Sequence, residues 1–168
     1  MSRLKLSVII VGLFLLLAMS IATIYFVPRL GTSIGVVIVN DAERSQKQKE
    51  AALLATPHGR LAYTFAAALV KGDFQAAHEL LTAEAKSEWP PEKLQSTYNQ
   101  MVHYFINPPH AAVPIMDMAD WQLPERRDGD FAWVYTAIVG EGDTEAVTLI
   151  IARDAEHLAI RSIEWGRP

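Results

Sequence analysis

The sequence contains no cysteine among its 168 residues. This absence excludes disulfide bonds, thiolate metal ligands, a cysteine nucleophile and a lipidated N-terminal cysteine. Basic residues are also scarce after the first segment, because three of the 15 lysines and arginines and none of the 19 acidic residues precede residue 30. The remainder therefore carries a net charge near −7. An acidic domain without a basic stripe argues against nucleic-acid binding, which needs clustered Lys and Arg to meet the phosphates.

Metal-ligand spacing is also missing from the sequence. The five histidines are His58, His78, His103, His110 and His157. None of them is three or four residues from a carboxylate in a repeated metal-ligand pattern. The sequence therefore predicts no metal site and no cofactor. His103, which lies next to a tyrosine and away from the apolar stripe of its helix, remains a candidate for the lip of a pocket.

A long uncharged run is the strongest feature that is present. After a short basic start, residues 1–5, the 22 residues 6–27 carry no charge. As a helix they extend roughly 33 Å, enough to cross a hydrocarbon core of about 30 Å. Small residues around Ser20 and Ala22 leave a cleaved signal peptide as the alternative. An uncleaved anchor is favoured because the run continues to Val27 and is closed by Pro28 and Arg29.

The charges around this run predict where the rest of the chain works. Arg3 and Lys5 favour an N-terminus inside the cell, although Arg29 opposes that orientation. The expected location is a bacterial inner (cytoplasmic) membrane, with the C-terminal domain periplasmic or extracellular. Residues 28–55 are then a linker or an interfacial or helical spacer, and residues 56–168 form one domain.

Helices are predicted in the first half of this domain. Thr56 and Pro57 have the order of an N-cap followed by proline at the first helical position. Gly72 and Asp73 are typical of a helix end and the cap of the next helix. The three predicted helices run from 57 to about 70, from 74 to about 81, and from Pro91 along an apolar stripe to Phe105.

Strands are predicted in the second half, where β-branched and aromatic residues alternate between turn signals. The four predicted strands lie within 113–123, at 131–139, at 144–153 and at 157–165. Pro114 restricts the first of them to an edge or an entry point of the sheet. A bulge near Arg161 and Ser162 would turn both Ile160 and Ile163 toward the core. Helices followed by an antiparallel meander predict an α+β fold in which the helices cover a curved sheet.

The sequence of residues 65–77, FAAALVKGDFQAA, resembles the opening helix pair of the nuclear transport factor 2-like superfamily, which includes SnoaL-like domains and ketosteroid isomerases. Residues 158–165, LAIRSIEW, look like the last strand of that superfamily. The resemblance covers roughly residues 56–168 and implies a cone-like domain. Many members place a β-hairpin before the third helix, and residues 82–90 are too short for one. This departure puts an inherited catalytic site in doubt.

Two interpretations of the aromatic residues stay open: they line a ligand pocket, or they fill the cone, which is favoured. The candidate pocket residues are Tyr98, His103, Tyr104, Trp133, Tyr135, Arg161 and Trp165. A space of about 300 Å³ or more beneath Trp133 and Tyr135 would support a pocket. In the isomerases a carboxylate removes a proton beside a carbonyl, and Tyr104, His103 and Asp117 are the residues closest to that chemistry. No catalytic residue is predicted.

These observations favour a membrane-anchored, non-catalytic binding or assembly module that presents an acidic domain to a protein partner or a small apolar ligand. One alternative is a small-pocket enzyme of the isomerase type. Another is an inner-membrane assembly subunit, since one helix followed by a cone is similar to such subunits of type IV secretion systems. Self-association through the sheet is a third possibility.

Overall fold

The computed structural model describes residues 41–118 and 125–166. Residues 41–55 form a helix, within which the chain divides into two compact units, after Gln46. The predicted anchor, residues 6–27, lies outside the described residues. Within the described ranges no helix has both the length and the apolar character needed to cross a membrane.

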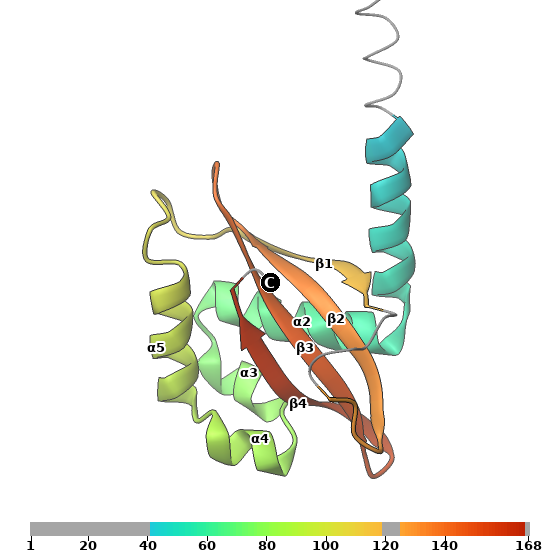
Figure 1. The fold of residues 1–168 in the computed structure, drawn as a ribbon. Coiled ribbons are helices and arrows are strands. Elements are labelled where there is room, and N and C mark those ends of the chain that lie inside the picture. Colours follow the sequence, from blue (N-terminus) through green and yellow to red (C-terminus); the bar gives the residue numbers. More distant parts are fainter. Residues whose placement is uncertain (1–40, 119–124, 167–168) are drawn as a thin grey trace, which may run out of the picture. The chain divides into compact units, whose positions relative to one another are not determined.

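Four further helices precede the strands (Figure 1). They are α2 (Pro57–Lys71), α3 (Phe74–Glu79), α4 (Ala83–Glu88) and α5 (Pro91–Met101). Thr56 caps α2 as predicted, its hydroxyl accepting a hydrogen bond of 3.0 Å from the Gly59 N–H. Gly72 ends this helix with φ of 74°, and the Asp73 side chain caps α3. The signals at Thr56, Gly72 and Asp73 are confirmed, whereas α5 ends at Met101 and not at Phe105 as its apolar stripe predicts.

Gly59 is required by a close approach of two backbone segments. A Cβ atom at this position would lie 2.0 Å from the carbonyl oxygen of Leu53, which no side chain can accommodate. The absence of a side chain therefore lets the helix of residues 41–55 turn directly into α2.

The segment between α3 and α4 differs from the prediction. α3 ends at Glu79 rather than near residue 81, because Leu80 to Thr82 leave the helix and pair with the sheet in parallel. The Ile160 N–H donates to the Leu80 carbonyl, and the Thr82 N–H donates to the Ile160 carbonyl, both at 2.9 Å. The short stretch that follows forms α4, so residues 57–101 hold four helices instead of about three.

The sheet is antiparallel, with its four strands in sequence order. They are β1 (Ala111–Asp117), β2 (Asp130–Val139), β3 (Thr144–Asp154) and β4 (His157–Trp165). β1 is an edge strand, as Pro114 predicts. Three of the strands contain a β-bulge, in which one residue has no partner in the register. The bulged residues are Ile115 in β1, Phe131 in β2 and Arg161 in β4. Such bulges bend strands and increase the twist.

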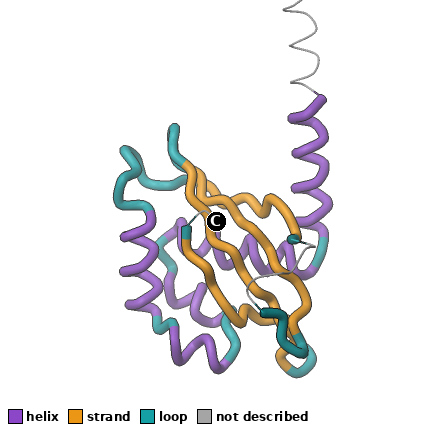
Figure 2. The backbone as a smooth tube through the Cα atoms, in the orientation of Figure 1, coloured by secondary structure: helices purple, strands orange, loops and turns teal. Residues whose placement is uncertain are grey.

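The core lies between one face of the sheet and the helices. Figure 2 shows helices α2 to α5 gathered behind and beside the strands. The buried side chains from the helices include Phe65, Leu69, Leu94 and Tyr98, and those from the strands include Val134, Ile138, Val147, Leu149, Ile151, Ile160 and Ile163. The Arg161 bulge puts both Ile160 and Ile163 in this core, which confirms the predicted irregularity. The structure is α+β, as predicted.

Candidate functional site

A groove of about 410 Å³ lies between α5 and the β3–β4 part of the sheet. Its lining residues are Thr97, Gln100, Met101, Glu145, Trp165 and Gly166. The volume falls in the range of small-ligand and peptide sites. Of the seven pocket candidates named from the sequence, Trp165 lines this groove.

The groove exists because the apolar stripe of α5 is narrow. Leu94 and Tyr98 of α5 are buried in the core, whereas Thr97 and Met101 stand at its border, half-exposed. β4 then ends at Trp165, and the extended conformation stops at Gly166, which has a φ of 91°. The last strand and the last turn of α5 are thus left with a hollow between them.

The Trp165 ring is held in place by its neighbours. It packs against the ring of Trp89 with a centroid separation of 5.6 Å and an angle of 49°. The Lys93 ammonium lies 4.2 Å above the Trp89 ring, a distance at which the cation is attracted to the ring face. One wall of the groove is therefore a preformed aromatic surface.

Two buried polar atoms in the lining residues have no hydrogen-bond partner within the described part of the chain. They are the Glu145 carboxylate oxygen Oε2 and the indole nitrogen Nε1 of Trp165. The other Glu145 oxygen, Oε1, accepts a hydrogen bond from the Tyr104 hydroxyl, which orients the carboxylate. An unsatisfied buried polar atom costs about 1–3 kcal/mol. Two residues of the groove lining therefore carry one unmet acceptor and one unmet donor.

Tyr98 belongs to the core rather than to the groove surface. Its ring lies 5.9 Å from that of Phe74 on α3, and its hydroxyl is buried without a partner among the described residues. Burial raises the pKa of Tyr98 to about 12. Tyr98 is thus a core residue that carries a polar atom.

His103 and Tyr104 follow directly after α5 and are exposed. His103 donates from Nδ1 to the Gln100 carbonyl oxygen at 2.6 Å, and its ring meets the Tyr104 ring edge-on at 5.7 Å. Tyr104 is joined to the groove through Glu145. Tyr104 therefore orients one residue of the groove lining, and His103 contacts Tyr104.

Trp133 and Tyr135 lie on the other face of the sheet. Alternation along β2 turns them away from Val134 and Ile138, which face the helices. Their cross-strand neighbours on that face are Ile150 and Thr148. Neither ring contributes to the groove. Glu164 lies opposite Thr148, and burial raises its pKa.

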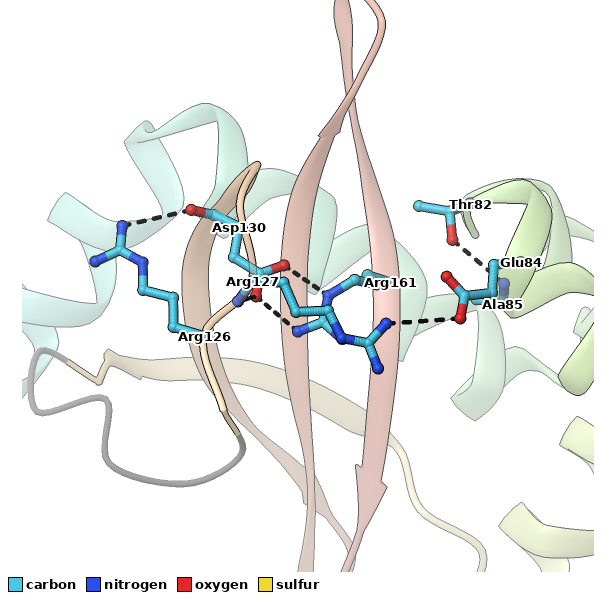
Figure 3. Close-up of polar contacts among 7 residues, drawn as sticks. All are labelled: Thr82, Glu84, Ala85, Arg126, Arg127, Asp130 and Arg161. Carbon is cyan, nitrogen blue, oxygen red and sulfur yellow. Dashed lines mark hydrogen bonds and ion pairs between the residues drawn. The ribbon is translucent and has the colours of Figure 1, made fainter.

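Arg161 occupies a polar cluster at the other end of the sheet (Figure 3). Its guanidinium forms two bonds to the Asp130 carboxylate, Nε to Oδ1 at 2.6 Å and Nη2 to Oδ2 at 2.7 Å. The Arg127 N–H donates to the same Oδ2 at 2.7 Å. The two paired side chains are 13% and 1% exposed, Arg161 and Asp130 respectively.

The Asp130 pKa reports how complete this pairing is. Burial by itself would raise the pKa of Asp130, but the hydrogen bonds from Arg161 and from the Arg127 backbone outweigh burial, and the pKa is lowered. Both carboxylate oxygens are satisfied. This cluster therefore acts as a structural staple, by which we mean the ion pair that joins Asp130 of β2 to Arg161 of β4 across β3, and not as a binding site.

The residues that best fit isomerase chemistry are not brought together. Asp117, at the end of β1, forms an ion pair with His58, Nε2 to Oδ2 at 3.3 Å. The Tyr104 hydroxyl donates a hydrogen bond to Glu145 on β3. Glu145 pairs with Ile138 on β2, and Ile138 pairs with Ala112 near the start of β1, so Tyr104 is held near that end of β1. The five residue steps from Ala112 to Asp117 span about 17 Å of strand.

The described ranges contain no group of three or more histidine and acidic side chains placed to hold a metal ion. No family model matches the chain, and comparisons with curated proteins and with solved structures give no match. The site must therefore be interpreted from its own geometry.

Most groove residues were not foreseen from the sequence. Thr97 and Met101 are four residues apart beside the Leu94–Tyr98 stripe, a spacing that places them together on the border of a helix face. Glu145 gives no local signal, since a polar residue at the start of a strand is common. Its role depends on Tyr104, 41 residues earlier in the chain.

Proposed function

We propose that this protein is a membrane-anchored, non-catalytic binding or assembly module that uses the α5–β4 groove to hold a partner outside the cytoplasm. Residues 6–27 act as the uncleaved anchor in this proposal. The observation that carries it is the pair of unmet hydrogen-bonding atoms in the groove, Glu145 Oε2 and Trp165 Nε1. A bound partner that satisfied both would recover part of the cost of burying them.

The remaining lining supports binding rather than bond-breaking chemistry. Trp165 and Met101 offer apolar and polarizable surface, whereas Thr97 and Gln100 offer neutral polar groups. Glu145 is the acidic member of the lining, and the groove residues include no histidine or lysine as its proton-transfer partner. Such an aromatic floor with a few fixed polar groups is the common composition of a recognition site.

The fold is compatible with a reduced member of the nuclear transport factor 2-like superfamily. In support, helices cover one face of a four-stranded antiparallel sheet, and α4 stands where many members have a hairpin. Membership of the superfamily and a role like that of type IV secretion assembly subunits stay proposals. The isomerase alternative is less favoured because Asp117 and Tyr104 lie at opposite ends of β1.

Site-specific photocrosslinking in native membranes tests the binding function. A photoreactive amino acid at Thr97 faces the groove, and the same amino acid at the exposed Gln95 of α5 is the matched control. We expect a discrete crosslinked species from position 97 that is absent from position 95 and is lost in Glu145→Gln. Equal crosslinking from both positions, or none from position 97, would refute the use of this groove.

Reporter fusions after Pro168 test the location. A reporter that is active only outside the cytoplasm should work in this fusion, and the fusion should stay in the membrane fraction after carbonate extraction. A silent reporter would contradict the proposed orientation, whereas a soluble, active product would show that residues 6–27 are cleaved.

A further inference from the structure

We propose that the groove receives a single extended segment of a partner protein, which lies along the outer edge of β4 and pairs a lysine or arginine with Glu145. This inference rests on the proposed function and specifies its partner. Three observations support it: the hydrogen-bonding pattern of β4, the pairing of its outer edge with residues 80–82, and the negative charge of Glu145 in the groove.

The register shows which backbone groups of β4 face outward. The Gly166 N–H donates to the Ala146 carbonyl at 2.9 Å, and the pairing continues as Trp165 with Val147 and Ile163 with Leu149. Hydrogen-bonded and non-hydrogen-bonded pairs alternate in an antiparallel ladder. The N–H and C=O groups of Trp165 and Ile163 therefore point away from β3, toward the edge.

This edge already pairs with an extended backbone at one point. Ile160 is bonded through both its N–H and its C=O to Leu80 and Thr82. The chain then turns into α4 at Ala83, so this pairing stops before Ile163. An added segment would continue along the same side of β4 toward Trp165, beside the groove. Addition of a strand to a sheet edge is a common mode of peptide recognition.

The unmet side-chain atoms suit such a segment. Trp165 Nε1 can donate to a carbonyl of the incoming segment, and Glu145 Oε2 can accept from a cationic side chain. Glu145 is the charged residue of the lining, and Tyr104 holds its carboxylate in place. Charge complementarity therefore selects lysine or arginine in the partner.

A second copy of this chain fits the edge less well. A symmetric dimer through β4 would bring the same edge of both copies together. In each copy α5 borders that edge, since Trp165 and three residues of α5 line the same groove. A dimer would bring two such helices to the contact, whereas one extended segment adds no second helix to this edge.

A random heptapeptide library, displayed on phage and selected against the full chain in lipid nanodiscs, tests this inference. We expect enriched peptides to carry a lysine or arginine with apolar residues two positions away, because alternate residues of a strand share a face. Their affinity should fall at least tenfold on Glu145→Gln and stay within twofold on Glu141→Gln, an exposed acid that bonds Asn107 instead. Methylating the backbone nitrogen of a residue next to the basic one should also weaken binding at least tenfold.

Several results would overturn the inference. Enriched peptides that are acidic, that bind Glu145→Gln as tightly as the unchanged chain, or that tolerate methylation at every backbone nitrogen would each do so. A selection that enriches no peptide above the level seen with empty nanodiscs would also overturn the inference. If the groove-specific crosslink from Thr97 persists in any of these cases, the extended basic segment is wrong and the binding function stands. If that crosslink is also missing, both fail.

Tyr104→Phe separates the charge of Glu145 from its placement. This variant removes the hydroxyl that orients the carboxylate but keeps the negative charge. We expect it to weaken peptide binding about threefold, less than Glu145→Gln. Equal loss in the two variants would contradict pairing with a basic side chain.

Discussion

The two ends of the same sheet treat buried polar groups in opposite ways. At Asp130 and Arg161 both carboxylate oxygens are bonded, by the guanidinium and by a backbone N–H. At Glu145 and Trp165 one oxygen and the indole nitrogen are buried and unbonded within the described structure. Unmet groups reduce stability unless a partner satisfies them, and the proposed binding function rests on this second arrangement.

The bulge in β4 shows how the paired end is built. Arg161 is the residue passed over in the register, so its side chain can cross β3 and reach Asp130 at the start of β2. β2 is also irregular there, at Phe131. The bulges in β2 and β4 thus bring Asp130 and Arg161 together in a fully hydrogen-bonded ion pair. The groove lies near the regular end of β4, where the N–H and C=O groups of Ile163 and Trp165 point toward the outer edge.

The largest expected effect is at the paired end. Asp130→Asn leaves the nearly buried Arg161 guanidinium without its counter-charge, and loss of one partner of a buried pair typically costs about 3–5 kcal/mol. Urea unfolding of the chain in detergent should show a loss of this size. Asp128→Asn, two residues away and exposed, should change the free energy of unfolding by under about 0.5 kcal/mol. A loss below about 1 kcal/mol for Asp130→Asn would contradict the staple.

The same pair predicts the response to acid. The pKa of Asp130 is lower in the folded state, so its contribution is complete above the unfolded-state value near 3.8 and is lost as the pH falls through the folded value. Unfolding curves of the unchanged chain and of Asp130→Asn should therefore converge below pH 4. Parallel pH profiles for the two proteins would show that the carboxylate is not held by Arg161.

Tyr98 gives the next largest effect, at alkaline pH. The unfolded state loses the phenol proton near pH 10, whereas burial holds the folded pKa at about 12. Between these values the unfolded state binds fewer protons, so the free energy of unfolding decreases, by about 2–3 kcal/mol in all. Comparing denaturant midpoints at pH 8.5 and 11.5 should show this decrease, and Tyr98→Phe should remove that part of it. An identical decrease in the variant would rule out Tyr98 as its source.

Glu145→Gln should have a small effect on the fold. The carboxylate has one bonded and one unbonded oxygen, so the free energy of unfolding should change by less than about 1 kcal/mol. The midpoint of urea unfolding measures this, with Glu141→Gln as the exposed control. A loss as large as that of Asp130→Asn would place Glu145 in the structural framework and remove the contrast between the two ends.

Lys93→Ala should have the smallest effect. It removes a cation above the Trp89 ring, an interaction worth about 0.5–1 kcal/mol at an exposed site. We expect the fluorescence of the Trp89–Trp165 pair to shift while the unfolding midpoint hardly moves. An unchanged spectrum would contradict a role for Lys93 in holding the aromatic wall.

Much of the fold was predictable because local signals agreed with the tertiary structure. Thr56 and Pro57, Gly72 and Asp73 set helix boundaries through backbone chemistry that needs no distant partner. The Arg161 bulge was readable because apolar residues on both sides of it had to face one core. The sequence did not show that residues 80–82 would leave α3, because that depends on pairing with Ile160, about 80 positions away.

The site was less predictable for the same reason. Trp165 and Tyr104 could be named as candidates because they are large and amphipathic. Glu145 could not, since its significance depends on one oxygen that Tyr104 bonds and another that nothing in the described chain reaches. Trp133 and Arg161 had suitable chemistry, but strand alternation and the Asp130 pair direct them elsewhere.

The central claim is that the unbonded polar atoms of Glu145 and Trp165 bind a partner, although leaving them unbonded lowers the stability of the fold. One variant tests this claim most directly. Glu145→Gln, combined with the photocrosslinker at Thr97, allows the unfolding midpoint and the crosslink yield to be measured on the same membrane preparation. We predict a free energy of unfolding within about 1 kcal/mol of the parent and a crosslink yield reduced at least tenfold. An unchanged crosslink yield in this stable variant would contradict the account.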